Sequence, residues 1–217
     1  MTVTLSERPA DLVEPEFEFD LVEPEPEGPD LDAMRTAIDE LVDGRFKVEI
    51  LGGEIIVSPL ARTLHDRIVN RLNSLLVRVL DEDTYDLTQR VEFVVDDANS
   101  PQPDLAIMAA ALRDETPDAT DYAAKDALLV IEVTSPSNGD SDRKWGRKYK
   151  AYAKGLIPIY LLVDPHAETG PSLTLFTQPN GKRYQAETTV AFGIPLRLPE
   201  PFDAVTIDSN RFPVPTA

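Results

Sequence analysis

The sequence predicts an α/β domain in which a mixed β-sheet is flanked by helices, preceded by a disordered acidic extension. The main indication is a pair of short apolar runs, 128–131 and 159–163, which are joined by a basic segment. Apolar, β-branched runs of this length, bounded by turn signals, are typical of buried strands. Two such strands joined by a helical crossover form a βαβ unit in a parallel or mixed sheet.

The composition fits one domain of ordinary size with extensions. The chain has 217 residues, 42% of them hydrophobic, and contains no cysteine. The lack of cysteine excludes disulfides and thiolate metal sites, and it fits a cytoplasmic protein. The sequence has no apolar span long enough to cross a bilayer and no basic-then-apolar signal pattern. We therefore expect a soluble cytoplasmic protein with no membrane partner.

The net charge of −18 is unevenly distributed along the chain. Fourteen of the 39 acidic residues lie in residues 1–43, whereas residues 140–154 hold six lysines and arginines against two aspartates. A basic segment of this kind allows a phosphate-bearing substrate, although the overall charge lowers the expected affinity for it.

The first 29 residues are rich in proline and glutamate and contain a short repeat, Asp11–Glu16 and again Asp20–Glu25. Such a segment buries too little apolar surface to offset its ordering entropy, which predicts a disordered tail over 1–29. The domain is then expected over 30–210, followed by a frayed C-terminal tail over 211–217.

The elements of the first half follow from capping, turn and periodicity signals. Asp30 is expected to cap a short helix that Gly44 stops, and Gly52-Gly53 to turn a hairpin. An apolar stripe from Leu64 to Val79 predicts a helix over 61–80. Strands are expected at 46–51, 54–57, 85–88, 91–95 and 105–108, and loops at 99–103 and 112–126.

The second half continues the sheet. Asn180-Gly181 is a strong hairpin signal between strands at 173–177 and 183–190. Short apolar runs at 194–198 and 205–207 are expected to extend the same sheet.

Two acidic residues occupy informative places among these strands. Asp104 directly precedes one apolar strand, and Glu132 interrupts the next. A carboxylate is costly to bury unless a cation compensates it. If the two strands are neighbours, both carboxylates can converge on one hard cation such as Mg²⁺, and Lys148 on the following helix could reach the same site.

Several short motifs in this order resemble those of the Uma-type family of putative restriction endonucleases. They are Glu49–Glu54 with Ser58-Pro59 and His65, then Pro103-Asp104, then Ile131–Ser137, then Lys148 with Tyr152-Ala153 and Gly155, and finally Ile159–Asp164. The resemblance covers roughly residues 45–165 and continues weakly beyond them. It implies a restriction-endonuclease-like fold of the PD-(D/E)XK superfamily. Proteins of this superfamily have a metal-dependent nuclease site.

Carried over to this chain, the resemblance makes Asp104 the aspartate of the PD element and Glu132 the acid on the next strand. Both, with the Val133 carbonyl, would hold Mg²⁺ (or Mn²⁺). The pattern places a lysine at position 134, where this chain has Thr134, so the catalytic lysine is expected to be Lys148.

Further residues have expected but less direct roles. Asp142 lies six residues before Lys148, farther than the family pattern places its acid, and Glu54 could bind a metal if its strand enters the site. The basic residues expected to contact DNA are Arg143, Lys144 and Arg147.

Each of these residues also has a structural explanation. Glu132 could form a buried ion pair with a lysine, and Asp104 could cap a loop. Lys148 could lie on a solvated helix face, and Glu54 on the surface of its hairpin. His65 shares a helix face with apolar residues, which favours a packed histidine bonded to backbone over a site residue.

The sequence therefore predicts a Mg²⁺-dependent endodeoxyribonuclease, with two alternatives open. The first is a nuclease-fold module without catalytic activity that binds DNA or a protein; Thr134, the spacing of Asp142 and the negative charge favour it. The second is a regulatory protein whose acidic tail binds a basic partner or its own basic helix. Deletion of residues 1–29 tests whether the tail blocks the helix: DNA affinity should then rise, and an unchanged affinity would contradict the idea. A homodimer is also open, because two sites cut two strands more easily than one.

Overall fold

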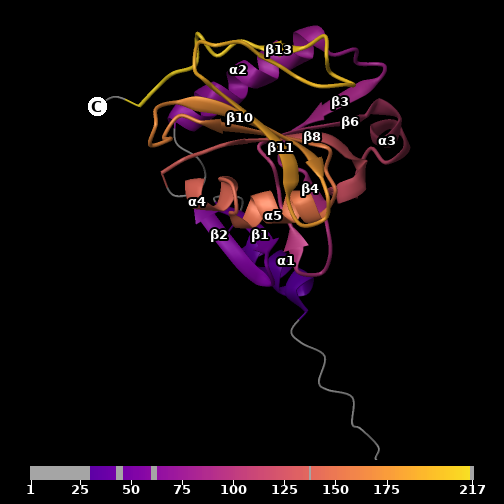
Figure 1. The fold of residues 1–217 in the computed structure, drawn as a ribbon. Helices are drawn as coiled ribbons and strands as arrows, with labels where there is room; N and C mark the ends of the chain where they lie inside the picture. Colours follow the sequence, from indigo (N-terminus) through magenta and orange to yellow (C-terminus); the bar gives the residue numbers. More distant parts are fainter. Residues whose placement is uncertain (1–29, 43–45, 60–62, 137, 216–217) are drawn as a thin grey trace, which may run out of the picture.

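The computed structural model describes residues 30–42, 46–59, 63–136 and 138–215. The tail predicted over 1–29 lies outside these residues, as do Gly44 and Ala61. A six-stranded mixed sheet forms the centre of the fold, with the order β11-β10-β9-β8-β6-β3 (Figure 1). The expected α/β architecture, with a mixed sheet flanked by helices, is confirmed.

The two apolar runs predicted as strands are the middle of this sheet. They form β8 (Ala127–Val133) and β9 (Ile159–Asp164), which pair in parallel. Their crossover contains α4 (Gly139–Asp142) and α5 (Arg147–Lys154), as expected for a βαβ unit. The neighbours β6 (Leu105–Ala109), β3 (Tyr85–Thr88), β10 (Ser172–Pro179) and β11 (Tyr184–Ala191) are joined to this pair by antiparallel pairing.

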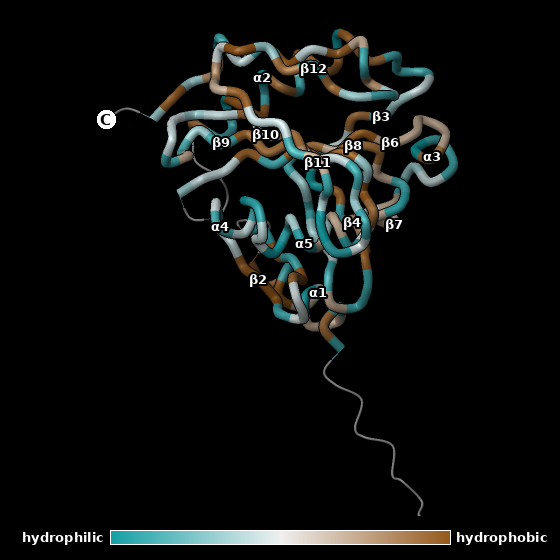
Figure 2. Tube along the Cα trace, viewed as in Figure 1, coloured by the Kyte–Doolittle hydropathy of each residue, from teal (hydrophilic) through white to brown (hydrophobic). Residues whose placement is uncertain are grey.

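Side chains alternate between two hydrophobic cores on the opposite faces of this sheet. On one face, Leu129 and Ile131 pack with Ile68, Leu72 and other residues of α2 (Thr63–Val79). On the other face, Val130 packs with Tyr149 and Tyr152 of α5. Figure 2 shows hydrophobic residues concentrated along the central strands, which are covered on both sides.

A smaller layer lies beyond α5 and contributes to the site. The hairpin β1 (Phe46–Leu51) and β2 (Glu54–Pro59) turns at Gly52-Gly53 as predicted, and both glycines have positive φ. The helix α1 (Leu31–Val42) packs on it, and the backbone N–H of Ala33 donates to Asp30 Oδ1 at 3.0 Å, as expected for an N-cap. Figure 1 shows this layer on the α5 side of the sheet.

Two segments expected to be loops differ from the sequence-based expectations. The expected loop at 99–103 contains β5 (Asn99–Ser100), which pairs with β1. The expected loop at 112–126 contains most of α3 (Ala110–Glu115), then β7 (Asp121–Ala123), which pairs with β4 (Glu92–Val94), and the 3-10 helix η1 (Ala124–Asp126). These segments are polar and short, so their pairing depends on distant partners that local periodicity does not reveal.

The C-terminal part also departs from the prediction. The strands β12 (Leu196–Arg197) and β13 (Thr206–Ile207) pair with each other in a separate sheet and do not extend the central one. Phe212, predicted in a frayed tail, is buried against Phe192 with a centroid distance of 5.5 Å. Apolar burial fixes this end of the chain. No helix in the described part of the chain is both long and apolar enough to span a membrane.

Candidate active site

The carboxylates of Asp104 and Glu132 lie at one end of the paired strands β6 and β8. Leu105 of β6 pairs with Ile131 of β8, and the antiparallel register therefore places Asp104 and Glu132 at the next position. The backbone N–H of Val133 donates to Asp104 Oδ2 at 2.8 Å. The two strands are neighbours, which was the condition for both carboxylates to converge.

Glu132 points to the α5 face because β8 alternates around it, with Ile131 and Val133 on the opposite face. There Lys148 Nζ lies 2.7 Å from Glu132 Oε1, and the Tyr152 hydroxyl donates to the same oxygen. Glu132 and Lys148 are both buried. The helix α5 thus brings Lys148 to Glu132 as expected, and the structural explanation of Glu132, a buried ion pair with a lysine, describes the same contact.

Glu49 of β1 is a site residue that the sequence analysis missed. Its carboxylate is buried, lies 3.1 Å from Lys148 Nζ, and accepts a hydrogen bond of 2.7 Å from the backbone N–H of Gln102. Lys47 lies 3.5 Å from the same oxygen, Glu49 Oε1, and donates to the carbonyl of Gln102. A carboxylate inside an apolar strand, the signal that revealed Glu132, was also present at Glu49.

Neighbouring charges and burial act in opposite directions on the pKa values of these buried side chains. Burial opposes a charge on Lys148, but Glu132 and Glu49 outweigh it and raise the pKa of Lys148 well above its ordinary value. Burial likewise opposes ionisation of Glu49, yet Lys148 and Lys47 lower the pKa of Glu49 below its ordinary value. At Glu132, by contrast, burial outweighs the nearby Lys148 and raises the pKa of Glu132 above its ordinary value. The ammonium group of Lys148 therefore lies between Glu49, whose charge is favoured, and Glu132, whose ionisation burial opposes.

The structure does not bring Glu54 into this group. Glu54 begins β2 after the glycine turn, its side chain is 63% exposed, and it pairs with Arg147 at 2.7 Å. The strand pairing explains the difference, because Glu54 lies opposite Leu51 at the turn, whereas Glu49 lies opposite Ile56 inside the hairpin.

His65 contacts Asp104 of the site. The sequence pattern had favoured a packed histidine bonded to backbone. His65 Nε2 lies 2.9 Å from Asp104 Oδ2, and the residue is buried in the first turn of α2. Burial opposes ionisation of Asp104, but the hydrogen bond with His65 and the nearby Lys47 outweigh it and lower the pKa of Asp104. His65 therefore helps to keep Asp104 charged and oriented.

Asp142 is brought near the same group from α4. It is fully buried, and neither carboxylate oxygen has a hydrogen-bond partner in the described part of the chain. Burial and the charge of Glu132 raise the pKa of Asp142 well above its ordinary value. The crossover thus compensates for the six-residue spacing, because Asp142 ends one short helix and Lys148 lies at the start of the next.

Thr134 occupies the position where the family pattern places a lysine, and it has a structural contact. Its hydroxyl donates to Asp164 Oδ1 at 2.6 Å. Arg143 binds the same carboxylate through two nitrogens, at 2.7 and 3.2 Å. These contacts, of which the one between Thr134 and Asp164 is buried, join the ends of β8 and β9 to the crossover that carries Lys148.

The basic residues predicted to contact DNA are paired with acidic side chains. Arg143 binds Asp164, and Lys144 lies 2.5 Å from Glu187. Arg147 pairs with Glu54. The positive charge of this segment is thus largely compensated within the protein, although Lys144 and Arg147 remain exposed.

The Asp164 contact gives a pH-dependent prediction. Burial opposes ionisation of Asp164, but hydrogen bonds from Arg143 and Thr134 outweigh it and lower the pKa of Asp164. A carboxyl group whose pKa is lower in the folded state stabilises the fold at pH values above its pKa in the unfolded chain. This stabilisation is lost as the pH falls through the pKa of the folded state. We expect Asp164→Asn to reduce the acid-induced loss of stability measured by urea unfolding from about pH 5 to about pH 2.5. An unchanged pH slope would contradict this role.

Gly146 sets the approach of α4 to α5. A Cβ at this position would overlap the backbone carbonyl oxygens of Asp140 and Ser141, which cannot rotate away. We expect Gly146→Ala to destabilise the fold by about 1–3 kcal/mol through overpacking. Urea unfolding measures this effect, and a midpoint equal to that of the wild type would contradict it.

A cleft of about 690 Å³ opens beside the site. Its lining includes Lys47, Glu49, His65, Asp104 and Lys148, together with polar residues of the crossover, Ser135, Asn138 and Ser141. The cleft therefore opens beside Asp104 and Lys47, and Lys148 borders it with a side chain that is buried.

The donor set fits a hard cation, although the described residues contain no group of three His, Asp or Glu side chains arranged as a complete metal site. Glu132 Oε2 is buried and has no hydrogen-bond partner among the described residues, and the nearby Asp104 is held in its charged form. Carboxylate and carbonyl oxygens are the ligands that Mg²⁺ prefers, usually together with water and substrate oxygens.

Comparisons with known proteins identify a family and a similar fold. A family model described as "Putative restriction endonuclease" (Uma2) matches residues 36–210. A crystal structure described as a putative nuclease belonging to DUF820, from Anabaena variabilis ATCC 29413, superposes with a TM-score of 0.59 at 16% identity. The similarity covers 76% of this chain and 88% of that one, and at this identity it shows a shared fold. No curated protein matches the chain.

The mixed sheet, with acidic residues at the ends of two neighbouring strands and a lysine from α5 beside them, fits the restriction-endonuclease-like class of protein. The family match spans most of the chain and includes every residue of the site. The chain belongs to the Uma2 family of putative restriction endonucleases.

Proposed function

We propose that this protein is a Mg²⁺-dependent endonuclease that hydrolyses phosphodiester bonds of DNA in the cytoplasm. The observation that carries this proposal is the convergence of Asp104, Glu132 and Lys148 at one end of the sheet, beside an open cleft. Membership of a family of putative restriction endonucleases supports the reaction class.

In this proposal, Asp104, Glu132 and the Val133 carbonyl hold the metal ion. The bound ion supplies Lewis-acid polarisation of the phosphate. His65 keeps Asp104 ionised and oriented through its 2.9 Å hydrogen bond. Lys148 orients the attacking water or stabilises the charge that develops on the phosphate, and Glu49 holds the lysine at that position through its 3.1 Å contact.

Cleavage of supercoiled plasmid tests the proposal. Wild-type protein should nick the plasmid in Mg²⁺ or Mn²⁺ and not in EDTA, and Asp104→Asn, purified in the same way, should be inactive. Nicking that survives in Asp104→Asn would indicate a contaminant or a different site. Failure of the wild type on plasmid, single-stranded DNA and RNA would overturn the proposal.

A second candidate is a nuclease-fold module that binds DNA or a protein without cleaving it. The observation that favours it is the ion pair between Glu132 and Lys148. Glu132 Oε1 already accepts hydrogen bonds from both Lys148 and Tyr152, which leaves this oxygen less available to a metal ion. A binding module predicts a melting temperature that does not depend on divalent metal. The enzyme predicts an increase in Mg²⁺ or Mn²⁺ that Glu132→Ala abolishes.

A further inference from the structure

Arg90 has a backbone conformation that is unfavourable for its side chain. It lies between β3 and β4 and has a φ of 59°, in the left-handed region. Glycine and asparagine adopt this region readily, whereas a long side chain there costs free energy. Such strain is found preferentially at functional sites, where a side chain must be directed to a particular place.

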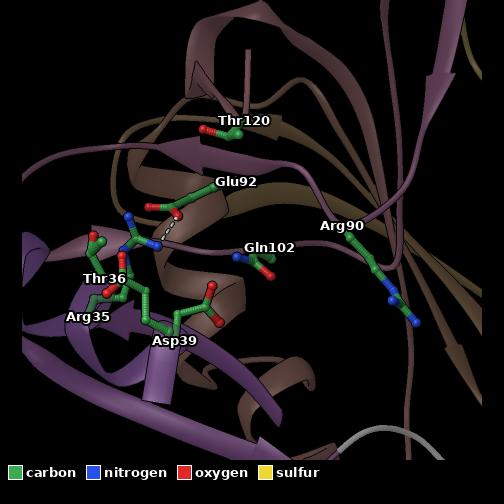
Figure 3. A pocket seen from close by; sticks show the side chains of 8 residues that line it. Arg35, Thr36, Asp39, Arg90, Glu92, Gln102 and Thr120 are labelled. Atoms are coloured by element: carbon green, nitrogen blue, oxygen red, sulfur yellow. Dashed lines mark ion pairs between the residues drawn. The ribbon is translucent and has the colours of Figure 1, made fainter. Parts of the chain in front are cut away.

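The Arg90 guanidinium has no partner in the part of the chain that the structure describes. Within the described residues Arg90 makes no ion pair and no side-chain hydrogen bond, and the residue is exposed. Figure 3 shows its side chain extending away from the ion pair between Arg35 and Glu92, whose atoms lie 3.2 Å apart. The three basic residues first expected to bind DNA are compensated by acids, and Arg90 is not.

Arg90 lies at the rim shared by two cavities. One, of about 370 Å³, is lined by Arg35, Glu92 and Thr120, and the other is the cleft of about 690 Å³ beside the active site. Gln102 also lines both cavities, and its carbonyl accepts a hydrogen bond of 3.3 Å from Lys148. A strand of substrate that leaves the active site along Gln102 would therefore meet Arg90.

The site beside Arg90 is acidic, so a phosphate-bearing substrate needs a nearby cation to bind there. The two lysines that line the cleft, Lys47 and Lys148, are already engaged with Glu49 and with the carbonyl of Gln102. Among the described residues of the cleft wall, Arg90 alone offers an uncompensated guanidinium. A guanidinium binds a phosphate through two parallel hydrogen bonds.

We propose that Arg90 binds a backbone phosphate of the nucleic acid strand in the cleft, next to the phosphate that is cleaved. This inference rests on the proposed function, since it assigns the substrate contact of the same site. The strained backbone then serves to direct the side chain over the cleft, at a cost in stability.

The experiment compares Arg90→Asn with the full-length wild type, because asparagine tolerates the left-handed backbone but lacks the cation. Binding of a fluorescein-labelled DNA duplex is measured by anisotropy in Ca²⁺ at several salt concentrations. We expect Arg90→Asn to bind about tenfold more weakly, with a salt slope smaller by about one. Its urea midpoint should equal or exceed that of the wild type. Arg90→Lys should recover part of the affinity.

Arg78→Asn is the matched control, because Arg78 is an exposed arginine of α2 that lines neither cavity. Equal affinity and salt slope for Arg90→Asn and Arg78→Asn would overturn the inference while metal-dependent nicking by the wild type still supports the nuclease. Arg90-dependent binding without any nicking would support the inference and overturn the nuclease. A wild type that neither binds nor nicks DNA would overturn both.

Discussion

Replacing Glu132 with glutamine is expected to lower the rate of metal-dependent plasmid nicking by at least about a hundredfold. The substitution keeps the shape of the side chain and removes its negative charge. In the proposed site this charge helps to hold the metal ion, and it also fixes Lys148 at 2.7 Å. Both functions depend on the carboxylate, and the loss should therefore appear in kcat at saturating metal.

The fold should survive this substitution, which allows the activity to be interpreted. Lys148 keeps Glu49 as a partner, and the Tyr152 hydroxyl can still donate to the amide oxygen of the glutamine. A cooperative urea transition for Glu132→Gln would show that the loss of activity is local.

Glu54→Gln is the matched control. This acidic residue was predicted at the site from the sequence, but its side chain is 63% exposed and pairs with Arg147. Exposed ion pairs contribute little to stability, so nicking should stay within about twofold of the wild type. If Glu54→Gln abolished nicking and Glu132→Gln did not, the site would have been placed wrongly.

The contrast between Glu49 and Glu54 shows which features of the site could be predicted from the sequence and which could not. The hairpin and its glycine turn were predicted from local signals, and the structure confirms them. Which of its two carboxylates reaches the site depends on how β1 packs under α5, a contact between segments almost a hundred residues apart. Local sequence patterns contain no information about that contact, although Glu49 stands in an apolar strand just as Glu132 does.

The central site residues could be predicted because their cause is local. An acid inside a buried strand needs a cation, and the crossover after β8 supplies Lys148. Arg143 also pairs with Asp140 three residues before it, but its closer partner Asp164 lies on β9. The partners of Lys144 and Arg147 lie on β11 and β2, which local sequence reasoning cannot reach. Arg90 was missed for the same reason, since neither its left-handed φ nor its place on the cleft wall is visible in the sequence.

Replacing Lys148 with methionine is expected to destabilise the fold by about 3–5 kcal/mol, because it leaves buried carboxylates without their cation. Lys148 and Glu132 are 3% and 0% exposed, and Glu49 lies on the other side of the ammonium group. Methionine fills most of the volume of the lysine stem, which separates the effect of charge from that of a cavity. Urea unfolding measures the change.

Two further variants show whether charge is the cause. Lys150→Met lies on the same helix but at an exposed position, and its effect should stay within about 0.5 kcal/mol. In Lys148→Met with Glu132→Gln, one of the two carboxylates left without a cation becomes neutral, and we expect the double variant to be more stable than Lys148→Met alone. If Lys148→Met were as stable as Lys150→Met, the ion pair would not stabilise the site, and Lys148 would be free to leave Glu132 when metal and substrate bind.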